Sequence, residues 1–399
     1  MKRVEANITP EVIKWARKTA GYSLEEAAHK IGRSEDEITA WETGEKKPTI
    51  PQARNAAKVY KRSLAVFFLP FPPKDFSTLR DFRKLPADFP RDFSPNLRFL
   101  IRQTQNKQSW LREYLIEEGY QPLSFIGSAS TSTSPEKLAV KIEKELRLNR
   151  EEILKCNNSQ DALNLWIAQV EKAGIYVFQS GNMQHEKIDI EEARGFALAD
   201  KYAPFIFLNA QDAKVAQIFT LAHELAHLWI DQSGISNLLP QGRTLPGMNK
   251  IEVFCNSVSG KLILPEEHFY QIWTSLDNSL SIKERIENTS TNFKVSKEVV
   301  ARRLFDLGYL DQKLYSDLAK QFSQEWFEYK EQYEKKKSTT TGGPHPYLLK
   351  VINNGRNFSR TVLAAYQGGN LSGKDTSRIL GIKLNKLSKF ASYAGVKLH

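Results

Sequence analysis

Cysteine is scarce in this sequence: among 399 residues only Cys156 and Cys255 are cysteine, and their positions match no metal-binding spacing. This excludes a disulfide framework and a cysteine-based zinc finger, and it favours a reducing, cytoplasmic location. The sequence also lacks an apolar run near the length of about 18 residues that a membrane helix needs, and its polar N-terminus does not resemble a signal peptide. We therefore expect a globular protein with no membrane partner.

Acidic residues are nearly missing from the C-terminal part of the chain. From Lys335 to His399 there are twelve Lys or Arg residues and one acid, Asp375, so this part alone accounts for the net charge of +11. The Ser-Thr-Thr-Thr-Gly-Gly-Pro run at residues 338–344 is the clearest linker in the chain. We therefore expect a small basic helical domain over residues 344–399.

The sequence does contain one segment, FTLAHELAHLW at residues 219–229, in which two histidines have the spacing of metal ligands on a helix. At about 100° per residue its apolar side chains form one stripe. The stripe consists of Ile218, Leu221, Leu225 and Leu228. His223 and His227 lie one turn apart on the other side, with Glu224 between them in sequence. Two imidazoles so placed can bind one Zn²⁺, and the carboxylate can act on a water that the metal activates. The alternative is an ordinary helix on which two histidines are packed or solvated.

A second segment supplies a third ligand. Catalytic zinc usually has three protein ligands and keeps one position for water or substrate. Residues 252–265 read as a helix with an apolar stripe and a polar face, and Glu252 lies on the polar face. We expect Glu252 to be the third ligand and Asn256, one turn later, to orient a ligand through a hydrogen bond.

These segments resemble the ImmA/IrrE family of zinc metallopeptidases over roughly residues 150–310. The family pattern is a strand, an F-T-x-A-H-E-x-x-H helix and an E-x-x-A-N-x-F-A-x-x-L-L-x-P helix, and residues 206–209 provide the strand. Cys255 and Val258 stand where the family usually has Ala and Phe, both at packing positions.

The resemblance implies the roles of four residues. His223, His227 and Glu252 would bind zinc, and Glu224 would be the general base. It also implies that the substrate is a repressor or another regulatory protein. For the oxyanion side of the reaction the residues leave three candidates open, His185, Tyr202 and His268.

The N-terminal residues predict a bundle of short helices. We expect helices over residues 8–19, 24–31 and 35–44. Ser23 with Glu26, and Ser34 with Glu37, have the spacing of capping boxes, and Gly32 lies in the turn between two helices. The stretch from Trp41 to Pro48 resembles the helix-turn-helix domains of XRE type, which often precede ImmA/IrrE peptidases.

Whether this element binds DNA stays open in the sequence. The second helix of a helix-turn-helix meets the bases with its N-terminal residues, which here are Ser34 and the three acids Glu35, Asp36 and Glu37. Acids at this place oppose contact with phosphates. The alternative is a bundle used for dimerisation or for holding a partner.

The basic C-terminal part repeats the helix-turn-helix spacing. Ser377, Gly381 and Leu387 are spaced as Ala28, Gly32 and Ile38 are. We expect Arg378 on the first helix and three lysines on the second to form a phosphate-binding surface. These lysines are Lys383, Lys386 and Lys389. The alternative is a cationic helical cap.

The chain as a whole predicts an α+β protein that is mostly helical. We expect a helix-turn-helix domain over residues 1–70, a helical connector over 71–150, a zincin-like peptidase domain over 151–335 and the basic domain over 344–399. Strands are expected at residues 175–178, 195–198 and 205–208. We expect the loop at 231–250 to border the cleft as a lid. A helix at 295–308 should carry Arg302 and Arg303 as solvated charges.

The function that follows is a zinc-dependent endopeptidase fused to a helix-turn-helix regulator, cleaving a repressor or another regulatory protein. The alternative is a non-catalytic transcriptional regulator or antitoxin that binds DNA and a toxin. Either function is compatible with a homodimer.

Overall fold

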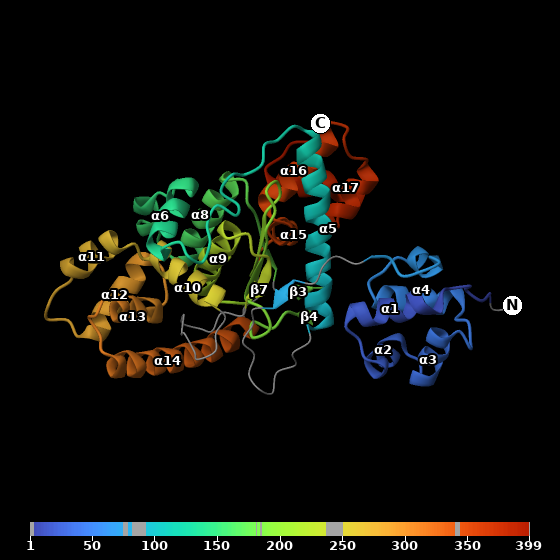
Figure 1. Cartoon of the computed structure of the whole chain (residues 1–399), viewed down its shortest axis with the longest axis horizontal. Coiled ribbons are helices and arrows are strands. Elements are labelled where there is room, and N and C mark those ends of the chain that lie inside the picture. The colour runs from blue at the N-terminus through green and yellow to red at the C-terminus, as the bar shows by residue number, and fades with distance from the viewer. Residues whose placement is uncertain are drawn as a thin grey trace. The chain divides into compact units, whose positions relative to one another are not determined.

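The computed structural model describes residues 4–74, 79–81, 93–180, 182–183, 186–236, 250–339 and 344–398 (Figure 1). The chain divides into two compact units. Unit 1 comprises Met1–Thr78 and Leu85–Asn106, and unit 2 comprises Leu79–Lys84 and Lys107–His399. The long helix α5 (Pro95–Glu117) begins in unit 1 and ends in unit 2. None of the helices in the described ranges is long and apolar enough to cross a membrane.

Unit 1 is a bundle of short helices around one apolar core. Its elements are α1 (Pro10–Ala20), α2 (Leu24–Ile31), α3 (Glu35–Thr43), α4 (Ile50–Val59) and the 3-10 helix η1 (Leu64–Phe68). Ile38 and Trp41 on α3 pack in this core with Ile13, Tyr60 and Phe67, and all five are buried. The predicted N-terminal helices are confirmed, with small differences at their ends.

The two predicted capping boxes have different outcomes. The Ser23 hydroxyl accepts a hydrogen bond from the Glu26 backbone N–H, and the Glu26 carboxylate accepts one from the Ser23 N–H, so this box is complete. At α3 the Ser34 hydroxyl accepts from the Glu37 N–H, but the Glu37 carboxylate accepts from Gln52 of α4 at 3.0 Å. The prediction of a second box was therefore wrong in its second half, because a tertiary partner holds the Glu37 side chain.

A buried ion pair joins α1 to α3. The Arg17 guanidinium donates to both carboxylate oxygens of Glu42, at 2.6 and 2.9 Å, and to the Tyr22 carbonyl at 2.9 Å. The Glu42 hydrogen bond outweighs burial and raises the pKa of Arg17. Two parallel N–H···O bonds fix the relative orientation of the two side chains, so the pair sets how the two helices cross.

Unit 2 contains a five-stranded mixed sheet in the order β1-β7-β5-β6-β2. Its strands are β1 (Arg80–Asp81), β2 (Tyr176–Ser180), β5 (Gly195–Leu198), β6 (Phe205–Asn209) and β7 (Gly234–Ser236), and β3 (Asn182–Met183) pairs with β4 (Glu186–Lys187) in a separate hairpin. β5 runs antiparallel to β6 and β7, whereas β2 runs parallel to β6, and β1 parallel to β7.

The three predicted strands are confirmed, as is the mostly helical α+β class. Strand β7 was missed because it lies in the segment that we predicted as a loop. Residues 237–249 of that segment, on which the predicted lid depends, lie outside the described residues.

Unit 2 also contains the remaining helical elements of the chain. They are α6 (Pro135–Leu146), α7 (Arg150–Leu154), α8 (Ser159–Lys172), α9 (Lys214–Trp229), α10 (Lys250–Ile263), α11 (Glu266–Ser275), α12 (Ile282–Phe293), α13 (Lys297–Asp306), α14 (Gln312–Thr339), α15 (Pro346–Asn354), α16 (Arg356–Gln367), α17 (Gly373–Leu380), the 3-10 helix η2 (Leu384–Lys386) and α18 (Leu387–Ala394). In Figure 1, α8, α9 and α10 lie on one side of the sheet and α15 and α16 on the other. Helix α9 contacts β5 and β6, while α15 and α16 contact β2.

The basic C-terminal helices pack directly on this core. Phe358 of α16 is fully buried and meets the rings of Trp110 and Phe205 edge-on, with centroids 5.9 and 5.7 Å apart. The Lys107 ammonium donates to the Asn354 side-chain oxygen at 2.7 Å. Helices α15–α18 therefore belong to the same compact unit as the sheet. The domain boundary near residue 344 stays a prediction.

The prediction that Arg303 is a solvated charge was wrong. Arg303 is only 6% exposed, and its guanidinium lies 3.4 Å from the Glu266 carboxylate. It shares the buried face of α13 with Val299 and Val300, which lie four and three residues earlier. Its neighbour Arg302 is partly exposed and donates to Asp306 at 2.9 Å.

A substitution at Gly355, which lies between α15 and α16, would test how closely the C-terminal helices approach the sheet. A Cβ added there would lie 2.7 Å from the Val177 carbonyl oxygen, whereas one at Gly369 would meet nothing within 4 Å, and both glycines have positive φ, +85° and +81°. We expect Gly369→Ala to cost about 1 kcal/mol for the backbone strain, and Gly355→Ala to cost about 1–3 kcal/mol more. The midpoint of thermal unfolding of the full chain measures both costs. Equal decreases in the two variants would contradict the close approach.

Candidate metal centre

The C-terminal half of helix α9, residues 220–229, is buried on all its faces, whereas its apolar stripe predicts burial of one face only. Ile218, Leu221, Leu225 and Leu228 are buried, as expected. Its polar residues are buried as well: His223 and Glu224 are fully buried and His227 is 1% exposed. The reason is that α9 packs against the sheet, α8 and α10 at the same time. A burial this complete is costly for polar side chains unless they have partners.

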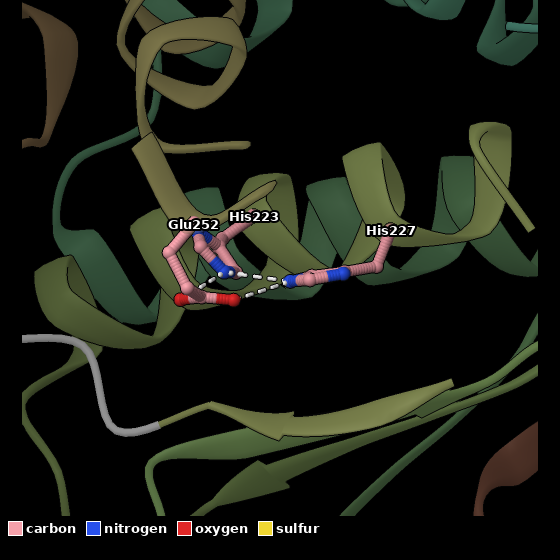
Figure 2. A group of neighbouring side chains, drawn as sticks. All are labelled: His223, His227 and Glu252. Carbon is pink, nitrogen blue, oxygen red and sulfur yellow. Dashed lines mark hydrogen bonds and ion pairs between the residues drawn. The ribbon is translucent and has the colours of Figure 1, made fainter. Parts of the chain in front are cut away.

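The structure brings together the three residues that the sequence singled out as metal ligands. His223 and His227 extend from α9 and Glu252 from α10, and their polar ends meet in one place (Figure 2). The two Nε2 atoms are 3.0 Å apart, and the Glu252 carboxylate oxygens lie 3.0 Å from His227 Nε2 and 3.3 Å from His223 Nε2. Ligands held at about 2.0–2.1 Å from one zinc ion in a tetrahedron lie about 3.3 Å from one another. The three donor atoms therefore fit a single cation.

Asn256 fixes the orientation of the first imidazole. Its side-chain oxygen lies 3.0 Å from His223 Nδ1, on the side of the ring away from the other two donors. A hydrogen bond to Nδ1 leaves Nε2 as the nitrogen that can bind a metal. Asn256 follows Glu252 by one turn of α10, so one helix provides both a donor and a support.

Among the three side chains, Glu252 carries the charge that suits a cation. Burial alone would raise the pKa of Glu252, but the two imidazoles beside it outweigh burial and lower that pKa to about 2. Burial lowers the pKa of His227, and its hydrogen bond to the Glu252 carboxylate offsets only part of this effect. For His223 the charge and hydrogen bond of Glu252 outweigh burial, and the pKa is raised. Glu252 is therefore ionised at neutral pH, the form that binds a metal.

Glu224 lies where α9 meets strand β5. A Cβ added at Gly195 would be 2.5 Å from Thr220 Cγ2 and 3.3 Å from Glu224 Oε1. The absence of a side chain at Gly195 therefore lets the helix come this close to the strand. Sequence reasoning missed Gly195. A glycine that opens a buried strand was the available signal.

A cavity of about 490 Å³ lies beside the N-terminal half of α9. Phe219 and Thr220 line it, and so does Arg194, the neighbour of Gly195. Arg194 forms a buried ion pair with Asp212 at 2.9 Å in its wall. A second cavity of about 280 Å³ is lined by Phe219 and by Asn256, so the two cavities flank Phe219. Sequence reasoning did not find the pair of Arg194 and Asp212.

Two of the three candidates for the oxyanion side lie within the described residues, and the contacts found for them are with residues other than the candidate metal ligands. Tyr202 lies in the turn between β5 and β6, where the Arg112 guanidinium is 5.8 Å from its ring centroid. His268 lines a small cavity together with Ile218, on the apolar side of α9. His185 lies outside the described residues.

The residues expected to contact nucleic acid are distributed over four elements, α3, α17, η2 and α18. Ser34 is the N-cap of α3, and Arg378 lies on α17, where it pairs with Asp375 at 2.9 Å. Of the three lysines expected on a second helix, only Lys389 is on α18. Lys383 precedes η2 and Lys386 ends it, because a 3-10 turn comes before that helix. The prediction was wrong in placing all three on one helix.

The close contact at Gly195 predicts a stability effect. Gly195→Ala should lower the free energy of unfolding by about 1–3 kcal/mol, because the added methyl group must push α9 away from β5. Gly260→Ala is the matched control, since Gly260 lies on α10 and a Cβ there would meet nothing within 4 Å. Chemical denaturation of both variants measures the difference. An unchanged stability of Gly195→Ala would show that the helix can shift without cost.

The support by Asn256 predicts an effect on metal affinity. Asn256→Ala should weaken zinc binding by about 10–100-fold, because His223 loses the hydrogen bond that holds its ring. Ser257→Ala, at the next position of the same helix, should bind zinc as the unaltered chain does. Competition with a chromophoric chelator gives both affinities. If the two variants bind zinc equally well, Asn256 does not position the ligand.

Comparison with protein families agrees with this division of the chain. Residues 170–305 match the model of the IrrE N-terminal-like domain, Peptidase M78, and this range holds the candidate metal ligands and Glu224. Residues 13–67 match a helix-turn-helix model and cover α1 to η1. No curated protein matches the chain. From the N-terminus, the chain therefore has a segment that matches the helix-turn-helix family model, followed by a segment that matches the IrrE N-terminal-like model of Peptidase M78.

Proposed function

We propose that this protein is a zinc-dependent endopeptidase that cleaves a regulatory protein. The observation that carries the proposal is the convergence of two imidazoles and a carboxylate in one buried place, with a further buried carboxylate, Glu224, next in sequence to His223. The Peptidase M78 match supports the reaction class, and the helix-turn-helix match supports a role in regulation.

The donor set fits zinc. Two imidazole nitrogens and one carboxylate oxygen are ligands of catalytic zinc, and they leave one position for water or substrate. We propose that His223, His227 and Glu252 hold the ion, with Asn256 orienting the His223 ring. When bound, zinc supplies Lewis acidity, which activates water and polarises the carbonyl of the substrate.

Glu224 would move the proton. Its carboxylate takes a proton from the attacking water, whose oxygen bonds to the carbonyl carbon of the substrate, and delivers the proton to the leaving nitrogen as the C–N bond breaks. This carboxylate lies beside the close approach of α9 to β5 at Gly195. A group that transfers protons in this way contributes about 10²–10⁴-fold to the rate.

The cavities beside α9 offer room for a substrate segment. The larger one has apolar walls from Phe219, Val299 and Trp326, together with charged groups such as Glu298. A protein segment with an apolar side chain near the cleaved bond suits such walls. We propose that this segment enters along Phe219, which borders both cavities.

A non-catalytic regulator would also suit the helix-turn-helix domain, and Glu224 argues against it. A structural zinc site usually has four protein ligands and needs no base beside them. Among the described residues, the group that could hold a metal contains three ligands, His223, His227 and Glu252. The toxin partner and the homodimer stay predictions from the sequence.

The substitution Glu224→Gln tests the proposal. It keeps the size of the side chain and removes its basicity, so cleavage should fall by at least about 10²-fold while zinc content stays unchanged. A peptide library made from a digested bacterial proteome, incubated with the zinc-loaded protein, would reveal cleavage as new termini in mass spectrometry. Regulators encoded beside this gene are the first intact proteins to add.

His227→Ala serves as the comparison, because it should lose both zinc and cleavage. Elemental analysis of the two variants separates loss of the base from loss of the metal. If Glu224→Gln cleaves as fast as the unaltered protein, Glu224 is not the base. If the zinc-loaded protein cleaves neither the library nor the neighbouring regulators, the non-catalytic interpretation is correct.

A further inference from the structure

Helices α17 and α18 reproduce the turn of the N-terminal helix-turn-helix. Gly381 ends α17 with φ +63°, and its backbone N–H bonds to the Ser377 carbonyl. Gly32 ends α2 in the same way, with φ +72° and a bond to the Ala28 carbonyl. The equivalent spacing in the sequence thus has an equivalent local structure at the turn, although η2 intervenes before α18.

One face of α18 is buried and the opposite face is polar and basic. The buried side chains are Leu387, Phe390, Ala391 and Ala394. Lys389 lies on the other face and is exposed, with the exposed Ser388 and Ser392 beside it, and Lys386, the last residue of η2 directly before the helix, is exposed as well. Lys386 and Lys389 are three residues apart across the junction of η2 and α18, so the exposed basic surface continues from the 3-10 turn onto the helix. Short hydroxyl side chains between them leave that surface open to a large ligand.

The turn before α18 and the helix α17 extend this basic surface. Lys383 is exposed just before η2, and Lys374 and Arg378 are exposed on α17. Asp375 is the one acid of the C-terminal part and pairs with Arg378. Positive charge therefore predominates across both helices and their turn, rather than at a single point.

An aromatic stack holds the basic helix in place. Tyr393 of α18 stacks on His345, with centroids 4.5 Å apart, and on Tyr347 of α15 at 5.9 Å. The Lys389 ammonium lies 5.5 Å from the Tyr347 ring centroid. These contacts anchor α18 to α15, so the basic face is presented by a fixed helix.

The corresponding helix of unit 1 has the opposite charge. Glu35 and Asp36 begin α3 and are exposed, and the half-buried Glu37 follows. Phosphate contacts dominate the affinity of proteins for nucleic acids, and carboxylates at the leading end of a helix oppose them. Of the two elements, the C-terminal one complements a phosphate backbone.

From this surface we propose that α17, η2 and α18 form a binding site for double-stranded DNA, with Lys383, Lys386 and Lys389 on the phosphates. A helix-turn-helix presents its second helix to the major groove, while neighbouring basic side chains contact the backbone. Phosphates lie along both edges of that groove, which matches positive charge spread over two helices. This site is independent of the peptidase proposal.

Lys383→Gln/Lys386→Gln tests the proposal with the full-length, zinc-loaded protein. The probe is a fluorescent DNA duplex of about 30 base pairs and mixed sequence, titrated at salt concentrations from about 50 to 200 mM. The affinity falls as the salt concentration rises, and each lost phosphate contact reduces the magnitude of the slope of log K against log salt by about 0.9. For this double variant we therefore expect a slope smaller in magnitude by about 1.8 and a weaker affinity at every salt concentration.

Lys141→Gln/Lys144→Gln is the matched control. These two lysines are exposed, three residues apart on α6, and belong to unit 2, so the variant loses the same charge elsewhere on the same unit. Its slope should equal that of the unaltered protein. Lys389→Gln is a third variant, expected to lower the slope by about 0.9.

Three results would overturn the proposal. The first is that the unaltered protein does not bind the duplex. The second is that the slope of log K against log salt decreases in magnitude equally in the C-terminal variant and in the α6 control. The third is binding of an RNA duplex of the same sequence without binding of the DNA. Circular dichroism of each variant verifies that the helices are intact. Since zinc and Glu224 do not enter the measurement, failure here is distinct from failure of the peptidase proposal.

Discussion

Four polar side chains buried in one place are the constraint on which unit 2 depends. His223, His227, Glu224 and Glu252 are all within 3% of complete burial, between two helices and a sheet. Removing a carboxylate and imidazoles from water is costly unless each finds a partner, and the short contacts among three of them provide part of that compensation. A cation in their midst would provide the remainder, so the same arrangement that creates the site makes the metal favourable for the fold.

The surrounding elements hold the two helices that carry these residues. Helix α9 lies close to β5 because Gly195 has no side chain. Helix α10 is held at its C-terminal end, where Arg150 donates to the Leu262 carbonyl at 2.5 Å and Lys261 pairs with Glu136 of α6 at 2.8 Å. A ligand set drawn from two helices keeps its geometry only if neither helix can slide, and these contacts restrict that motion.

The sequence predicts what local periodicity and motif spacing determine. The spacing of His223 and His227 on one helix needed no tertiary information, and the three strands followed from short apolar runs between turns. Other features depend on contacts between distant residues. Arg303 is buried because it lies on the face of α13 that approaches Glu266. The Glu37 carboxylate accepts a hydrogen bond from Gln52 of α4, and so does not complete the predicted capping box. Gly195 matters only once its strand is known to face Thr220. The periodicity of one segment cannot predict these contacts, because they join residues that are far apart in the sequence.

The basic face of α18 belongs to the same compact unit as the candidate metal ligands. Gly355 permits close contact with β2, Phe358 packs on Phe205 of β6, and α9 covers the same sheet. The Ser-Thr-Thr-Thr-Gly-Gly-Pro run alone would have indicated a separate module on a tether, whose position would be independent of the peptidase core. Packing on the sheet removes that independence. A polyanion bound at α18 would therefore also bring the candidate metal centre close to that polyanion, because both belong to one compact unit. This holds whatever the helix-turn-helix domain of unit 1 binds.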